Sequence, residues 1–150
     1  MDLKLWREYL TQMERLGETL EQLTAVEREK AAAVGRGDLN AVDACMKREQ
    51  VFSLNLRGLD QKREKLLAQM GVSGATLRQM EDMAPPEALL ETKRVVTKLR
   101  ERYQVFQSAS EVARNALECN LHAIEKLQKS RGMEDIEPMP GEVRQADVRA

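Results

Sequence analysis

The chain has 150 residues, enough for one domain with a continuous core, and a formal net charge of −1. This balance excludes a whole-molecule field that would attract DNA or an anionic membrane. Charged residues make up 33% of the chain and aromatic residues only 3%, which is typical of long, surface-exposed helices and unlike an enzyme cleft lined with rings.

The first ten residues contain no unbroken apolar run, and no later stretch approaches the roughly 20 apolar residues that span a bilayer. We therefore expect a soluble, cytoplasmic protein without membrane insertion. In that compartment Cys45 and Cys119, which lie far apart and outside any CxxC pair, are expected to be small buried thiols rather than a disulfide.

The first predicted helix covers residues 3–34, because apolar residues recur at steps of three and four. Gly17 stands where a strict heptad would place an apolar residue, and Leu16 takes over that role. The apolar row consists of Leu3, Trp6, Leu10, Met13, Leu16, Leu20, Leu23 and Val26.

The stretch "AVGRGDLNAV" is interpreted as a turn between two helices. Gly35 is expected to end the first helix as a left-handed cap, and Asp38 to cap the second. An adhesive role of Arg36-Gly37-Asp38 has no export signal to support it. A phosphate loop is also disfavoured, because the Asp38 carboxylate would repel the anion.

The second predicted helix covers residues 39–70 and must pack antiparallel to the first, since only a short turn joins them. Glu49 and Arg63 interrupt its apolar row, and we expect their stems to pack while their charged heads reach water. Gly71 is expected to end the helix. The apolar row consists of Leu39, Val42, Met46, Phe52, Leu56, Leu59, Leu66 and Met70.

A connector with its own short helix follows. Thr76 and Gln79, three residues apart, match a capping box, which predicts a helix over residues 77–83. Pro85 and Pro86 end this helix, and a proline suits the first turn of the next one.

The third predicted helix, over residues 87–131, is the longest and contains no Gly or Pro. Its heptad core positions predict a coiled-coil-like seam. Its 45 residues exceed the 32 of the first helix by 13, or about 20 Å at 1.5 Å per residue. The core positions are Leu89, Thr92, Val96, Leu99, Tyr103, Phe106, Ser110, Ala113, Leu117, Asn120, Ile124 and Leu127.

Together these elements predict an all-α fold: an elongated antiparallel three-helix bundle over residues 1–131, made of a long hairpin, a short connector helix and a longer third helix. Residues 132–150 hold two prolines and two glycines and are expected to form a flexible C-terminal tail. The apolar residues near the end of the third helix would lack a partner within the bundle, so the tail, a second copy or a client must cover them.

The sequence offers no catalytic or metal-binding constellation. His122 is the only histidine, and with Cys119 it makes two ligands at most, so we predict no metal and no cofactor. The carboxylates lie on charged helix faces rather than in a concave site that could separate their pKa values, so we predict no enzyme. The basic run from Lys93 to Arg102 is interpreted as a solvated helix face instead of a nucleic-acid patch, since no aromatic residues interleave with it.

The order of these features resembles the FlgN-type flagellar export chaperones. The likeness is best over residues 3–80, with a long helix, a Gly-Asp-Leu turn, a second helix closing on "LRGLDQKREKLLAQMG", and then "TLRQM". The third helix resembles the family in length and character. The residues that carry the resemblance are Glu27, Glu29, Gly37, Asp38, Leu59, Arg63, Leu66, Leu67 and Gly71.

The resemblance implies a non-enzymatic cytoplasmic chaperone. It would hold the polymerising terminal segment of hook-associated, hook–filament junction proteins and deliver it to the flagellar export apparatus. In the family the client is held mainly by the C-terminal region, which here is the end of the third helix and the tail. The predicted partner-binding residues for an amphipathic client segment are Leu117, Leu121, Ile124, Leu127, Met133, Ile136 and Met139.

Two alternatives remain open at this point. The tail itself could cover the end of the third helix, or the chain could be a homo-oligomeric coiled-coil scaffold or adaptor with Asn120 setting the register. The sequence leaves open which hook-associated protein is the client, and whether the free chain forms a weak homodimer.

Overall fold

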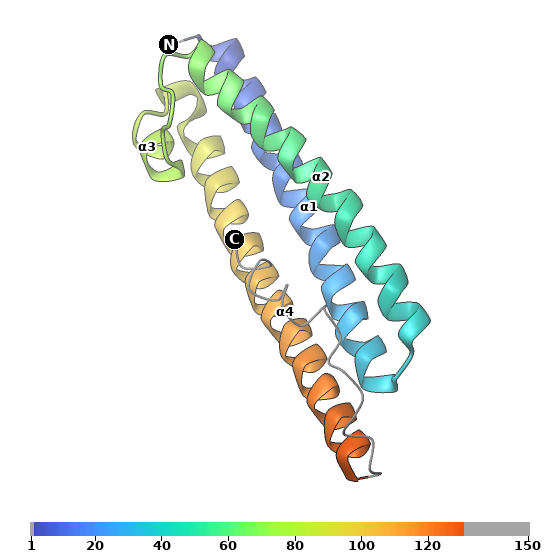
Figure 1. The fold of residues 1–150 in the computed structure, drawn as a ribbon. Coiled ribbons are helices and arrows are strands. Elements are labelled where there is room, and N and C mark those ends of the chain that lie inside the picture. Colours follow the sequence, from blue (N-terminus) through green and yellow to red (C-terminus); the bar gives the residue numbers. More distant parts are fainter. Residues whose placement is uncertain (1, 131–150) are drawn as a thin grey trace. The chain divides into compact units, whose positions relative to one another are not determined.

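The computed structural model describes the backbone of residues 2–130 and the side chains of residues 2–122 (Figure 1). Over this range the chain forms helices and no strands, which confirms the all-helical fold class. The chain divides into two compact units, Met1–Leu117 and Glu118–Ala150. The elements are α1 (Leu3–Arg36), α2 (Leu39–Gln69), α3 (Leu77–Asp82), the 3₁₀ turn η1 (Pro86–Ala88) and α4 (Leu89–Ser130).

The turn between α1 and α2 corrects one prediction and confirms another. Gly37, not Gly35, takes the left-handed conformation with φ 69°, and the N–H groups of Gly37 and Asp38 donate to Val34 O and Ala33 O, each at 3.0 Å. These two bonds are the Schellman pattern of a helix end. Asp38 caps α2 as expected, its carboxylate accepting from Ala41 N–H at 3.1 Å. Because the left-handed Gly37 directly precedes Asp38, the N-cap of α2, the chain reverses direction between the two helices within very few residues.

The observed bounds reduce the predicted mismatch in helix length. The α1 helix has 34 residues and the described part of α4 has 42, a difference of eight where 13 was predicted; one residue of this change is Arg131, which lies outside the described residues. At 1.5 Å per residue this is about 12 Å instead of about 20 Å. One reason is that α1 runs on to Arg36. The other is that Pro86–Ala88 forms a 3₁₀ turn, so the α-helical part of the last helix begins only at Leu89.

The connector matches the sequence prediction closely. Gln79 N–H donates to Thr76 Oγ1 at 3.2 Å and Thr76 N–H donates to Gln79 Oε1 at 2.9 Å, which is the expected capping box. Gly71 is left-handed with φ 75°, and the following Val72 N–H donates to Leu67 O at 2.9 Å. The connector is held down by Met80, which is fully buried in the core.

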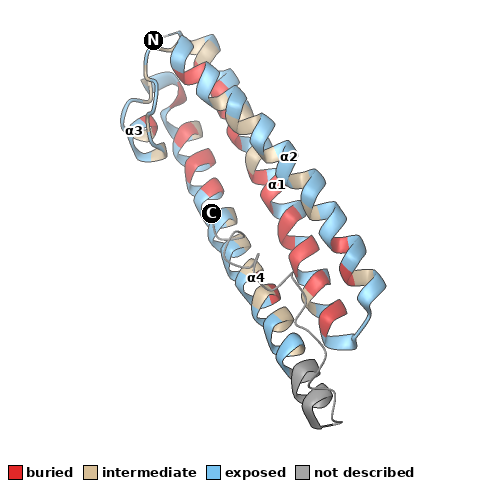
Figure 2. Ribbon diagram, in the orientation of Figure 1, coloured by how far each residue is buried: buried red, intermediate tan, exposed pale blue. Residues whose placement is uncertain are grey.

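The core of the first unit joins α1, α2, α3 and the first part of α4. At one end, Trp6 Nε1 donates to Thr92 Oγ1 at 2.8 Å, and Thr92 Oγ1 donates to Ala88 O at 2.7 Å, all three residues being buried. At the other end, Val34 and the adjacent Ala33 pack near Leu117. Within this unit α4 therefore runs parallel to α1. Figure 2 shows the continuous buried stripe along α1.

The seam of α4 follows the predicted one at most of its described positions, with Thr92, Val96, Leu99 and Ala113 buried. Tyr103 is 51% exposed and Leu89 is also exposed, so both predicted core positions are wrong. Arg102 occupies the place beside Tyr103, because Gly17 of α1 leaves room for it. A methyl group at Gly17 would lie 2.7 Å from Arg102 Nη1 and 3.1 Å from its Cδ. Arg102 Nη2 also lies 3.3 Å from a carboxylate oxygen of Glu21.

The first half of α2 likewise turns a different face inward. Leu39 and Met46 were predicted to be core residues but are exposed, and Cys45 is buried instead. The inward positions follow the steps Val42, Cys45 and Glu49, which bring Glu49 opposite Lys30 of α1. An ion pair thus sets the rotation of α2 here, where the apolar pattern alone is ambiguous.

Candidate functional site

The predicted partner-binding residues fall in both units. Leu117 of the first unit is half-buried against Ala33, Val34 and Val42 at the hairpin turn. Leu121 of the second unit is 39% exposed. Ile124 and Leu127 belong to α4 beyond the residues whose side chains are described. Met133, Ile136 and Met139 lie outside the described residues.

Leu117 and Leu121 share a helix face, since four residues separate them on α4. The two residues differ in burial: Leu117 is partly covered by the hairpin, whereas Leu121 is exposed to solvent. An apolar row of this kind can bury a partner's apolar side chains but offers no group for acid–base or nucleophilic chemistry.

Residues on the same stretch of helix that could carry thiol or metal chemistry are solvent-facing. Cys119 is a free, exposed cysteine, which corrects the expectation of a buried thiol, and His122 is exposed. Within the described part of the chain, no three His, Cys, Asp or Glu side chains gather closely enough to hold a metal ion. Cys45 is free and buried, and its burial, together with the nearby Glu29 carboxylate, raises the pKa of its thiol.

The basic run of α4 divides into two kinds of residue. Lys93, Arg94, Lys98 and Arg100 are exposed, as the interpretation of a solvated face requires, and Arg100 pairs with Glu81 of α3 at 3.3 Å. Arg102 differs because it is half-buried across Gly17. It acts as a packing residue between α4 and α1 rather than as part of a charged patch.

A buried lysine between two carboxylates was not predicted. Lys30 Nζ donates to both carboxylate oxygens of Glu49, at 2.9 and 2.8 Å, and lies 3.2 Å from Glu27 Oε2. The Glu49 head therefore meets Lys30 instead of water. The Glu27 oxygen has an ion-pair distance but no hydrogen bond. Burial, reinforced by the neighbouring Glu49 carboxylate, raises the pKa of Glu27 to about 7 against the opposing positive charge of Lys30.

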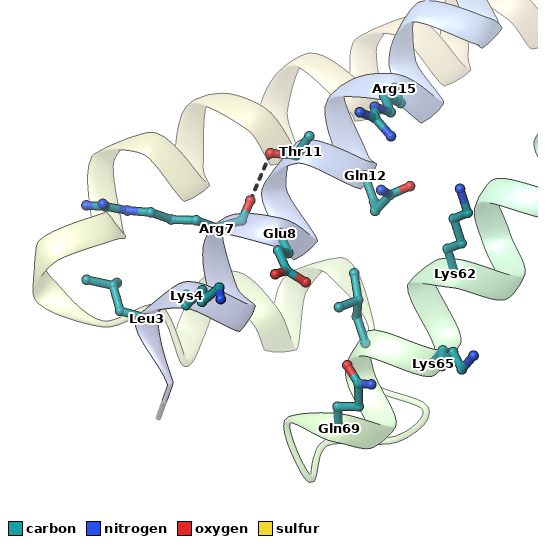
Figure 3. Close-up of a pocket in the computed structure, with 11 residues that line it drawn as sticks. Leu3, Lys4, Arg7, Glu8, Thr11, Gln12, Arg15, Lys62, Lys65 and Gln69 are labelled. Carbon is teal, nitrogen blue, oxygen red and sulfur yellow. Dashed lines mark hydrogen bonds between the residues drawn. The ribbon is translucent and has the colours of Figure 1, made fainter.

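A groove of about 840 Å³ between the start of α1 and the end of α2 was also missed by sequence reasoning. It is lined by five basic residues and one acidic residue: Lys4, Arg7, Arg15, Lys62, Lys65 and Glu8. We call it the basic groove. Figure 3 shows Glu8 and Gln12 extending from α1 toward α2, with Lys62 on the facing helix, while the Arg7 side chain leads away. The spacing of its α1 residues by threes and fours was the available sequence signal.

None of the helices in the described range is both apolar and long enough for a membrane crossing. The fold is that of an all-helical protein whose long helices pack together and are joined by a short connector helix. The family model described as FlgN protein matches residues 1–130, and the chain belongs to the FlgN family. This confirms the resemblance and extends it over the whole of α4. No curated protein and no solved structure matches the chain.

Membership gives the chain its established role. FlgN proteins are cytoplasmic, non-enzymatic export chaperones for hook-associated proteins of the flagellum, and they are linked to the flagellar export apparatus. A chaperone needs a surface that binds its client reversibly, and the apolar row of α4 is the candidate for that surface.

Proposed function

We propose that this FlgN-family chaperone holds the terminal amphipathic segment of its hook-associated client along the end of α4 and the tail. The observation that carries the proposal is the exposed side chain of Leu121, four residues after the half-buried Leu117. The proposed client surface consists of Leu117, Leu121, Ile124, Leu127, Met133, Ile136 and Met139.

The driving force is the burial of apolar surface that both partners otherwise expose. An amphipathic client helix laid along this face of α4 would remove its own apolar stripe and Leu121 from water. Full burial of a Leu or Ile side chain contributes roughly 1.5 to 3 kcal/mol before the cost of ordering the client. The methionines of the tail suit this role, because their flexible side chains adapt to an imperfect fit.

Such binding would prevent premature assembly by occupying the segment through which the client polymerises. The chaperone would then deliver the client to the export apparatus and release it there. No covalent step is involved, so the whole activity rests on an equilibrium between bound and free client. Weak, reversible contacts are therefore suited to the task.

The test is a double substitution, Leu121→Asp with Ile124→Asp. Two lost apolar contacts at roughly 1.5 to 3 kcal/mol each predict a fall in client affinity of about 100-fold or more. Affinity is measured by titrating the purified chain with terminal peptides of candidate hook-associated proteins, which also identifies the client. Circular dichroism checks that helicity is unchanged.

The matched control is Val51→Asp with Leu54→Asp. These residues are also apolar, are three apart on a helix, and are 57% and 63% exposed on α2. The control pair should leave client affinity within about twofold of the original, since exposed positions outside the client surface carry little binding energy. Equal affinity in the Leu121 and Ile124 variant, or equal loss in the control, would reject the proposed surface.

We also propose that the free chain is a monomer or a weak homodimer that the client disperses, with no nucleic-acid partner and no membrane insertion. Light scattering across a range of concentrations tests this. A concentration-independent dimer paired along residues 89–127 would favour the coiled-coil scaffold instead. Strongly salt-dependent association with DNA or RNA would contradict the absence of a nucleic-acid partner.

A further inference from the structure

The basic groove shares no residue with the proposed client surface, and it carries an excess of positive charge. Five basic residues and one acidic residue line it, with the Arg7 side chain leading away from α2, although the whole chain has a formal net charge of −1. Positive charge is therefore gathered at the end of the hairpin where α1 begins and α2 ends. A concave site with one sign of charge attracts ligands of the opposite sign.

The cations of the groove are not neutralised by neighbours. Among residues 2–122, Lys4, Arg7, Arg15, Lys62 and Lys65 form no ion pair with a carboxylate. Elsewhere in the same range, basic side chains such as Arg48 and Arg63 are paired, at 2.6 and 2.9 Å. The groove thus keeps its positive charge available for an acidic partner.

A buried acceptor in the groove narrows the chemistry of that partner. Gln12 lines the groove, and its Oε1 atom is buried without a hydrogen-bond partner. An unsatisfied buried acceptor calls for a donor, and a peptide backbone N–H supplies one. A phosphodiester backbone carries only acceptors in the same position. Rotation of the Gln12 side chain into the groove would present this acceptor to a backbone N–H of a bound peptide.

The floor of the groove adds an apolar component. Leu66 of α2 is buried and Leu3 of α1 is half-buried, and both line it. A ligand with carboxylates toward the lysines and apolar side chains toward these leucines would match both features. An acidic peptide with apolar residues at helical spacing has this arrangement.

We propose that the basic groove binds an acidic, partly apolar peptide segment of another protein, with a backbone N–H of that segment donating to Gln12 Oε1. This assigns a second docking surface to the chaperone, one that uses charge where the client surface uses apolar burial. The two surfaces have no residue in common, so the chain could hold a client and dock through the groove at once.

The experiment uses the full chain and two labelled probe peptides in fluorescence anisotropy. One is a short helix-forming peptide with Glu on one face and Leu on the other, and its counterpart has Lys in place of every Glu. The Glu peptide should bind about tenfold tighter or more, and its affinity should fall as salt is raised. Equal affinity of the two peptides, or no binding of the Glu peptide, would overturn the proposal.

Charge reversal tests the location of binding. Lys62→Glu with Lys65→Glu should weaken the Glu peptide roughly tenfold or more, because two attractions become repulsions. The matched control, Lys93→Glu with Arg94→Glu, makes the same change in net charge at exposed positions of α4 and should stay within about twofold. If the control variant loses as much affinity for the Glu peptide as the groove variant, the attraction is unspecific, and the assignment of binding to the basic groove is overturned.

Gln12→Leu tests the buried acceptor. The melting temperature of the free variant should be unchanged or higher, since an unsatisfied polar atom is removed, while affinity for the Glu peptide should fall roughly 2- to 10-fold. An unchanged affinity would remove the argument for a polypeptide.

Two further outcomes would show that the basic groove binds a different ligand, and either would overturn the proposal. In one, single-stranded oligo-dT binds as tightly as the Glu peptide with the same dependence on Lys62 and Lys65. In the other, neutralising the acidic residues Glu134, Asp135 and Glu137 of the same chain raises peptide affinity about tenfold or more, which would assign the groove to that segment.

Discussion

Replacing Glu27 by Gln should make the stability of the α1–α2 hairpin less dependent on pH. Glu27 is only 4% exposed, and its pKa is raised from 4.5 to about 7, chiefly by burial. Between these values the folded chain keeps a proton that the unfolded chain has released. The contribution of Glu27 to stability is therefore fully present below pH 4.5 and is lost as the pH rises through about 7.

The size of the effect follows from the pKa change. One pKa unit corresponds to about 1.4 kcal/mol, so the full loss between acidic and alkaline pH is about 3 kcal/mol. The amide introduced by Glu27→Gln cannot titrate, and Lys30 keeps its two bonds to Glu49 in the variant. The free energy of unfolding of Glu27→Gln, relative to the original chain, should accordingly rise by about 2 to 3 kcal/mol between about pH 5 and pH 8.

The assay is urea unfolding of both chains at the two pH values, followed by circular dichroism. Glu29→Gln is the matched control, because Glu29 pairs with Arg48 at 2.6 Å on the surface, where both side chains are about half exposed. Its relative stability should change by less than about 0.5 kcal/mol over the same pH range. If the difference in free energy of unfolding between Glu27→Gln and the original chain does not change with pH, Glu27 does not retain a proton in the folded chain, and the reasoning is refuted. A difference of opposite sign would mean that attraction by Lys30 outweighs burial.

Two further substitutions probe the packing of the first unit. Thr92→Val leaves the Trp6 indole N–H buried without an acceptor, so it should lower the free energy of unfolding by about 1 to 3 kcal/mol, measured by thermal or urea unfolding. Thr97→Val, at an exposed position of α4, is its control and should lower the free energy of unfolding by about 0.5 kcal/mol or less. Gly58→Ala, with nothing within 4 Å of the added methyl, should stabilise α2 by about 0.5 to 1 kcal/mol, while Gly17→Leu should destabilise by about 1 to 3 kcal/mol. Reversed signs in the glycine pair would contradict the packing described between α1 and α4.

Local signals in the sequence were sufficient to locate the helices. The capping box at Thr76 and Gln79, the N-cap at Asp38 and the left-handed Gly71 act within a few residues, so each is readable without the fold. Choosing between Gly35 and Gly37 was harder, because both positions hold a residue that allows a positive φ and only the position of the following cap decides.

Contacts between helices account for the remaining differences. The rows through Tyr103 and through Arg102 both fit steps of three and four, and the space above Gly17 on another helix selects Arg102. The Lys30 ion pair and the basic groove depend on the register of α1 against α2, which a row of leucines does not specify. The client surface was predicted from helix length and family likeness together, and it stays a prediction at each of its residues, Leu117 and Leu121 included.

The single tryptophan of the chain lies in the joint between α1 and α4, bonded to Thr92 and shielded from solvent. Its emission is therefore a built-in optical reporter of that joint. If client binding separated α4 from the hairpin, Trp6 would be exposed to water and its emission maximum would move to longer wavelengths. If the client bound the apolar row without separating the helices, the emission maximum would stay unchanged. Measuring tryptophan fluorescence while unlabelled client is added can thus distinguish a chaperone whose helices separate on binding from one whose helices stay packed.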